Sequence, residues 1–264
     1  MKQRIITGVV AGAIFIAFLV LGGYFFQVFV GILAFLALSE LFKMKGLHIL
    51  SLEGALATLA VLVIAMPFVT KLLKLGADGP FLLFGIFIFA MMAVMVFSKG
   101  KYSFDDLAYP FLSAFYVGFG FQALNLARVS GIVIVLFALF IVWSTDSGAY
   151  FIGRQFGRHK LIPSVSPNKT IEGSIGGIVS AVIVAVIMGI FLKAQLPSMP
   201  LWLLAALTVI FSAIGQLGDL VESSIKRHFE VKDSGKILPG HGGILDRFDS
   251  MIFVLPIMHL LGLF

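Results

Sequence analysis

The sequence contains no cysteine, and only 12% of its 264 residues are charged. The absence of cysteine excludes disulfide bonds, thiolate zinc sites and a cysteine nucleophile, and it leaves the redox compartment unreadable. Soluble domains average about 25% charged and about 45–50% apolar residues. In this chain 60% of the residues are apolar, and the mean hydropathy is +1.09. The composition excludes a soluble globular enzyme, a disordered protein and a nucleic-acid-binding domain, so no nucleic-acid partner is expected.

Long apolar runs fill most of the chain, and they predict an all-α, polytopic membrane helix bundle of about nine transmembrane helices. Nine spans of about 20 residues would use about 180 residues, which leaves no room for a sizeable soluble domain. We expect one membrane domain, 1–264, with spans for packing, lipid contact and dimerisation in 1–130 and the catalytic spans and loops in 131–264. The expected spans are 5–21, 24–42, 53–70, 80–97, 107–127, 131–152, 174–192, 201–221 and 245–264.

The first apolar run resembles a signal peptide, because it follows Lys2 and Arg4. No small-x-small cleavage site follows it, so we interpret it as a retained span with almost no gap before the second. Small residues four apart, at Gly8/Gly12 and Gly173/Gly177, are interpreted as helix-packing positions.

The distribution of lysine and arginine predicts a cytoplasmic N-terminus and an outer C-terminus. With nine alternating spans, fifteen of the 19 basic residues fall on the inside and four on the outside, as the positive-inside rule requires. In a prokaryotic host this topology places the multi-pass protein in the inner (plasma) membrane. The inside residues are Lys2, Arg4, Lys43, Lys45, Lys99, Lys101, Arg154, Arg158, Lys160, Lys169, Lys226, Arg227, Lys232, Lys236 and Arg247; the outside residues are Lys71, Lys74, Arg128 and Lys193.

Asp146 is the first polar residue of note, at the cytoplasmic end of the sixth expected span. A carboxylate at membrane depth costs a few kcal/mol unless it has a partner. Arg154, Arg158 and Lys169 are the candidate partners in the polar connection 153–173. Glycine and serine beside basic residues suit phosphate binding, although a basic loop that only enforces topology remains an alternative.

A denser polar group lies at the end of the eighth expected span. Asp219, Ser223 and Lys226 follow helical spacing and share one face, with Glu222 beside them. A stripe of acid, hydroxyl and base on a membrane helix must line a protein interior or a wet cavity.

The loop after this span leads through Gly242 and Gly243 into the last span, where Asp246 and Asp249 are three residues apart. If the glycines precede the helix start, free backbone amides there can hold a phosphate. The four carboxylates at two span ends have two explanations. Basic residues neutralise them in a salt-bridge network, or they bind Mg²⁺ as hard oxygen ligands. The glycines and bases favour a Mg²⁺–nucleotide site.

Two further residues stay undecided. His241 is flanked by glycines and is able to contact phosphate or shuttle a proton, although a loop hydrogen bond is the simpler role. Glu40 lies near the end of the second span. Its three alternative roles are an ion pair with Lys43, a side chain that extends to the membrane–water interface, and a part of an interior site.

The run from Ser224 through Lys232-Asp233-Ser234-Gly235-Lys236 and Pro239-Gly240-His241-Gly242-Gly243 to Asp246-Arg247-Phe248-Asp249 resembles the signature of phosphatidate cytidylyltransferases (CDP-diacylglycerol synthases). Asp146 with Tyr150, Gly153-Arg154 and the stretch 166–173 are similar to the same family's pattern. The motif resemblance covers about residues 140–250.

The resemblance implies a nucleotidyltransferase of phospholipid biosynthesis that converts CTP and phosphatidate into CDP-diacylglycerol and pyrophosphate. It implies Mg²⁺, a monovalent cation such as K⁺, and an integral membrane homodimer in the lipid bilayer. The distribution of basic residues given above predicts that the active site faces the cytoplasm. Asp219 and Asp246 would hold metal, with Asp249 as a further metal ligand or a second-shell partner. Lys226 and Arg227 would be further catalytic residues. The implied substrate-binding residues are Asp146, Arg154, Ser166, Lys169, Glu172, Ser223, Lys232, Lys236, His241, Gly242, Gly243 and Arg247.

Two other functions compete with this one. A CTP-dependent polyprenol or phytol kinase would transfer the γ-phosphoryl group to an alcohol and would need a general base. An ion transporter would also carry intramembrane carboxylates, but it would favour internal repeats and midplane sites. The chain shows no repeat, and its polar residues gather at one membrane face.

Overall fold

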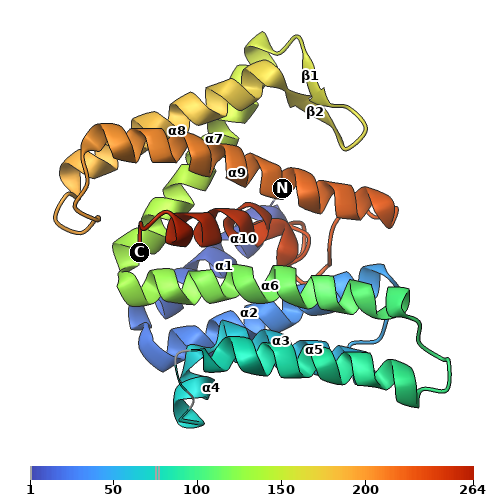
Figure 1. Cartoon of the computed structure of the whole chain (residues 1–264). Helices are drawn as coiled ribbons and strands as arrows, with labels where there is room; N and C mark the ends of the chain where they lie inside the picture. The colour runs from blue at the N-terminus through green and yellow to red at the C-terminus, as the bar shows by residue number, and fades with distance from the viewer. Residues whose placement is uncertain (1, 75, 77) are drawn as a thin grey trace. The chain divides into compact units, whose positions relative to one another are not determined.

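The structure is a computed structural model that describes residues 2–74, 76 and 78–264; Met1, Leu75 and Ala77 lie outside the description. In this described part the chain forms ten helices and one small hairpin (Figure 1), which confirms the all-α prediction. The elements are α1 Lys2–Leu21, α2 Gly23–Met44, α3 Leu52–Ala65, α4 Pro67–Leu72, α5 Gly79–Phe97, α6 Phe104–Ser130, α7 Ile132–Phe156, β1 Lys160–Ile162, β2 Ser166–Thr170, α8 Ile171–Phe191, α9 Leu201–His228 and α10 Leu245–Leu260.

Seven described helices are long and apolar enough to cross a membrane: α1, α2, α5, α6, α7, α8 and α9. The protein is therefore an integral membrane protein with several spans. The other two expected spans correspond to shorter helices, α3 with 14 residues and α10 with 16. At 1.5 Å per residue they are about 21 and 24 Å long, less than the roughly 30 Å hydrocarbon core. The count of nine stays a prediction.

The expected span 53–70 is wrong as a single helix, because the chain breaks at Met66. Proline at position 67 has no backbone N–H and disfavours a helical conformation in the residue before it. Met66 accordingly has φ −115° and ψ 83°, and Pro67 starts α4. The freed amide of Phe68 donates to Gln27 Oε1 at 2.9 Å. By contrast, the expected minimal gap after the first span is confirmed, since Gly22 alone separates α1 from α2.

The chain divides into two compact units, each described by itself. The first unit comprises Met1–Asn125 and Val231–Asp246, and the second comprises Leu126–Glu230 and Arg247–Phe264. The expected parts, 1–130 and 131–264, follow chain order, whereas the polar segment Val231–Asp246 belongs with the N-terminal helices.

Hydrogen bonds between helices add to the apolar contacts that hold the first unit together. α3 packs against both α2 and α5. The hydroxyl of Tyr109 on α6 donates to the Leu41 carbonyl on α2 at 2.7 Å, and buried Asn125 donates to the Ala65 carbonyl at the end of α3. These bonds satisfy polar groups that water cannot reach in the membrane.

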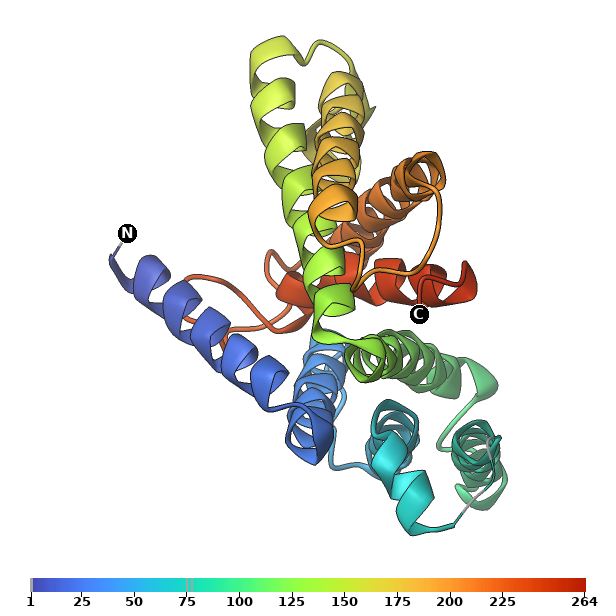
Figure 2. The ribbon, with the colours of Figure 1, turned by 90° about the vertical axis from the view of Figure 1, so that its left-hand side faces the viewer.

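In the second unit, α7 and α8 lie side by side, with the β1–β2 hairpin at their common end (Figures 1 and 2). Small residues allow this approach: a Cβ at Gly177 would lie 2.7 Å from the Thr145 carbonyl oxygen. The packing interpretation of Gly173/Gly177 is thus confirmed. At Gly12 it is wrong, because a Cβ there would meet no atom of the described residues. α9 joins the pair through a 2.8 Å hydrogen bond between Thr145 and Ser212.

We predict that Gly177→Leu destabilises the protein, because its side chain must displace the α7 backbone. Overpacking of this kind costs about 1–3 kcal/mol, so the unfolding midpoint in detergent should fall by at least about 3 °C. Gly12→Leu is the matched control and should leave the midpoint unchanged. Equal midpoints for the two variants would contradict the packing role of Gly177.

Candidate functional site

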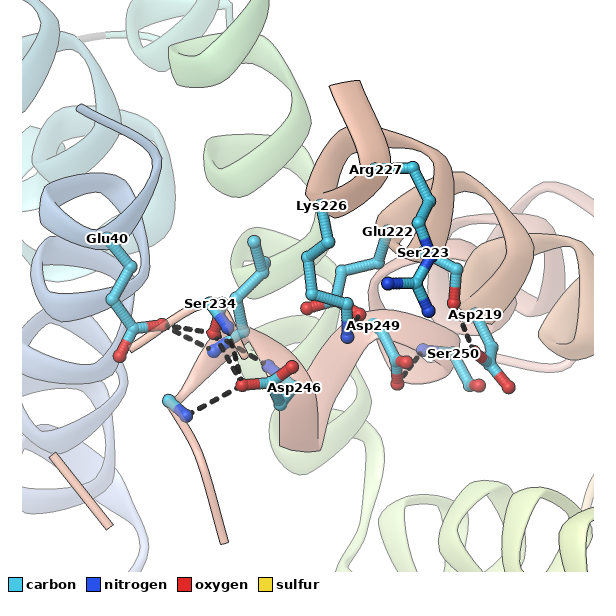
Figure 3. Close-up of polar contacts among 12 residues, drawn as sticks. Glu40, Asp219, Glu222, Ser223, Lys226, Arg227, Ser234, Asp246, Asp249 and Ser250 are labelled. Carbon is cyan, nitrogen blue, oxygen red and sulfur yellow. Dashed lines mark hydrogen bonds and ion pairs between the residues drawn. The ribbon is translucent and has the colours of Figure 1, made fainter. Parts of the chain in front are cut away.

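The polar stripe predicted on α9 is present in the structure (Figure 3). Ser223 Oγ donates to Asp219 Oδ1 at 3.2 Å, which confirms that these two residues share a face. Lys226 Nζ pairs with Glu222 Oε2 at 2.5 Å, and the Glu222 side chain is fully buried. Helical spacing produces both pairs, since each joins residues i and i+4.

A basic residue from the hairpin reaches the same stripe. Lys169, on β2, forms an ion pair with Asp219, and the two side chains are only 27% and 31% exposed. The hairpin was not predicted, since 153–173 was expected to be a polar connection. Thr170 ends β2 and caps α8 by accepting from the Gly173 amide at 3.1 Å. Arg227 Nε donates to the Val165 carbonyl at 3.4 Å and links the hairpin turn to α9.

Three carboxylates of the second unit interact electrostatically. Asp219 repels both Asp146 on α7 and Asp249 on α10, and these two also repel each other. Lys169 and Arg247 are the cations that offset the charge of Asp146. Three helices of the second unit each contribute one of these carboxylates.

Two of the expected cationic partners of Asp146 have other contacts. The Arg154 guanidinium donates to the Tyr150 hydroxyl at 3.2 Å. The Arg158 amide donates to Glu172 at 3.1 Å, and His159 Nδ1 lies 2.6 Å from the same carboxylate. Of the three expected partners only Lys169 interacts with Asp146, and Arg247 joins it. The contacts of Glu172 place it at the entry to the hairpin; its substrate-binding role, like that of Ser166 on β2, stays a prediction.

Asp246 Oδ2, in the first unit, accepts from two amides and lies within hydrogen-bond distance of a hydroxyl (Figure 3). The donors are the Ser234 amide at 2.8 Å and the Gly243 amide at 2.7 Å, and the Ser234 hydroxyl oxygen lies 2.9 Å away. The expectation of free amides at this helix start is therefore wrong for Gly243. The next two amides, of Ile244 and Leu245, donate to Glu40.

The glycine-rich loop before α10 forms a tight turn. The Leu238 amide donates to the Gly242 carbonyl at 3.0 Å, and the His241 amide donates to the Leu238 carbonyl at 2.8 Å. Gly242 has φ +85°, a conformation that favours glycine. His241 Nδ1 is buried and has no hydrogen-bond partner among the described residues. Lys232 and Lys236 are exposed on the same segment.

The residues present fit a magnesium ion by chemistry. Among the described residues, no group of three or more His, Cys, Asp and Glu side chains is arranged to hold a metal ion. Mg²⁺, however, is usually bound by one or two carboxylates and completes its shell with water and phosphate oxygens. The mutually repelling oxygens of Asp146, Asp219 and Asp249 are such donors, and a cation would relieve their repulsion.

Sequence reasoning missed one residue of the site and left another undecided. Ser234 lies within the signature run, but its two bonds to Asp246 depend on how the loop folds. Glu40 was visible only as an acid in an apolar run, a pattern that by itself indicates a partnered interior group.

The fold and these polar groups define a polytopic membrane protein that carries carboxylates paired with basic residues and backbone amides. Comparison with known sequences is more specific: the cytidylyltransferase family matches residues 2–264, and the chain belongs to this family. It is therefore a nucleotidyltransferase. The chain is 46% identical to a phosphatidate cytidylyltransferase of Staphylococcus saprophyticus, with 99% of this chain and 98% of that protein covered. Proteins of the same name from Staphylococcus epidermidis and Staphylococcus aureus are 45% and 43% identical over the same shares.

We predict that Lys169→Met lowers kcat/KM at least tenfold, about 1.4 kcal/mol, because the variant leaves Asp219 without its cation beside two other carboxylates. Lys160→Met is the matched control, since Lys160 is an exposed lysine that pairs with Thr170 across the same hairpin. Steady-state kinetics of the two purified variants check the prediction. Equal losses of kcat/KM in the two variants would contradict the specific role of Lys169, because they would show that any positive charge on the hairpin has the same effect.

Proposed function

We propose that this chain is a CTP:phosphatidate cytidylyltransferase that makes CDP-diacylglycerol and pyrophosphate for phospholipid biosynthesis. The observation that carries the proposal is the 43–46% identity, over nearly the full length of both chains, to proteins named phosphatidate cytidylyltransferase. The acid, base and glycine groups described above support it, because a CTP-dependent transfer brings many phosphate oxygens into one site.

In the reaction, an oxygen of the phosphatidate phosphate forms a bond to the α-phosphorus of CTP. The bond from that phosphorus to the α,β-bridging oxygen breaks, and pyrophosphate leaves with the electron pair. The phosphate is already a nucleophile, so no strong general base is required. Catalysis then consists of positioning and charge neutralisation.

The cations of the site are already paired with carboxylates, which gives them a defined role in substrate binding. Lys169 pairs with Asp219, and Lys226 pairs with Glu222. An incoming phosphate competes with each carboxylate for its lysine, so binding exchanges one anionic partner for another. Arg227, tied to the hairpin turn, adds a further donor for phosphate oxygens.

Asp219, Asp246 and Asp249 are the residues that we propose as ligands of Mg²⁺, with K⁺ as a second cation. When bound, Mg²⁺ neutralises phosphate charge and favours departure of pyrophosphate. The two amide bonds to Asp246 Oδ2 orient that carboxylate, as second-shell donors do in metal sites.

Topology and assembly complete the proposal. The fifteen-to-four distribution of basic residues supports a cytoplasmic active site, where CTP is available, in the inner membrane of a bacterium. A homodimer is proposed on the family resemblance alone.

The first test is pyrophosphate release by the purified protein in detergent, with Mg²⁺, CTP and phosphatidate each omitted in turn. Release that requires all three, with CDP-diacylglycerol formed in equal amount, is expected. CDP release with a polyprenol or phytol acceptor would instead establish a lipid kinase. No turnover by folded protein with either acceptor would overturn the proposed function.

We predict that Asp219→Asn lowers kcat more than tenfold, a loss above about 1.4 kcal/mol, while the protein stays in the membrane. The amide removes the negative charge that pairs with Lys169 and that we propose to hold a cation. Asp105→Asn is the control, because Asp105 is an exposed acid in the first turn of α6. If Asp219→Asn keeps more than a tenth of wild-type kcat, the assignment of Asp219 as a metal ligand is wrong.

A further inference from the structure

Glu40 is a buried acid that the proposed mechanism does not use. It lies near the end of α2 and is only 3% exposed. A buried carboxylate is costly unless hydrogen bonds or an opposite charge compensate it. Its contacts therefore show which part of the protein it serves.

All three of its recorded hydrogen-bond donors belong to the segment 231–246 of the same unit. Oε1 accepts from the Ile244 amide at 2.8 Å, and Oε2 accepts from the Leu245 amide and from the Ser234 hydroxyl, each at 2.9 Å (Figure 3). The two amides belong to the first residue of α10 and to the residue before it, where unsatisfied N–H groups and the helix dipole favour a negative charge. Glu40 thus joins α2 to the start of a helix about two hundred residues later in the chain.

Ser234 extends this connection to Asp246. Its hydroxyl lies 2.9 Å from Asp246 Oδ2 as well as from Glu40, and its amide donates to the same Asp246 oxygen at 2.8 Å. The Asp246 amide in turn donates to Ser234 Oγ at 3.3 Å. Fixing Ser234 therefore fixes the orientation of the Asp246 carboxylate.

The glycine at position 243 is a second, independent sign of this arrangement. A Cβ there would collide with both Ser234 Oγ and the Glu40 carboxylate. Only a residue without a side chain lets the backbone pass this close to the two groups.

We propose that Glu40 is a positioning residue, which holds Ser234 and the start of α10 so that Asp246 keeps one orientation for catalysis. The catalytic consequence rests on the proposed function, in which Asp246 belongs to the site. The structural part of the proposal, the attachment of 231–246 to α2, is independent of the reaction.

The activity test uses Glu40→Gln, which replaces one acceptor oxygen with an NH₂ group that faces a donor. We expect kcat to fall at least tenfold. Glu53→Gln is the matched control, because Glu53 is an equally buried acid (5% exposed) of the same unit that bonds to Tyr102. This control should retain wild-type kcat within twofold.

A double-mutant cycle separates positioning from general destabilisation. Ser234→Ala removes the hydroxyl that links Glu40 to Asp246 and leaves the Glu40 bonds to α10 in place. If Glu40 acts through Ser234, the fold-loss of activity in the double variant is much smaller than the product of the two single fold-losses. For the control pair, Glu53→Gln with Ser234→Ala, the fold-loss should equal the product of the single fold-losses. Multiplying losses for Glu40→Gln and Ser234→Ala would overturn the proposal.

Hydrogen–deuterium exchange gives a readout that does not depend on turnover. Peptides covering 231–246 should exchange faster in Glu40→Gln than in wild type, and Glu53→Gln should leave them unchanged. Unchanged exchange in Glu40→Gln would overturn the proposal even if activity fell. If the wild-type protein formed no CDP-diacylglycerol, the proposed function would fail, while the exchange result would still decide whether Glu40 holds the segment.

Discussion

The cost of placing an ionised group in a membrane-spanning helix is the constraint on which the polar structure depends. Such a group requires a partner inside the protein. Asp219 has Lys169, Glu222 has Lys226, and Glu40 has two amides and a hydroxyl. The pair Glu222–Lys226 lies within α9, whereas the other two partners tie a polar segment to an apolar helix. The hairpin is thereby fixed to α9, and the segment 231–246 is fixed to α2.

The same pairing is the basis of the substrate binding that we propose. In the proposed mechanism a phosphate takes over the lysine of a carboxylate, and the carboxylate that is released then becomes available to the proposed cation. The helices α7 and α8, which pack closely at Gly177, lead into and out of the hairpin that carries Lys169. The helices that pack at Gly177 therefore flank the segment whose lysine, Lys169, takes part in the proposed chemistry.

Much of this could be predicted where the determinants are local. Apolar runs predicted the long helices, and helical spacing predicted the shared face of Asp219 and Ser223. The Pro67 break was missed because the apolar run continues through it. The hairpin 160–170 was missed because it is short and polar. The pair Lys169–Asp219 spans 50 residues, and the bond from Ile244 to Glu40 spans 204. Such contacts depend on tertiary packing, which no local pattern specifies.

The central claim is that the α-phosphorus of CTP is transferred to phosphatidate. The most direct test gives the purified protein CTP that is radiolabelled at either the α- or the γ-phosphorus and separates the lipid product. The account predicts label in the lipid from α-labelled CTP only, with the γ-label recovered in pyrophosphate. Label in the lipid from γ-labelled CTP would contradict the account and would show phosphoryl transfer by a lipid kinase.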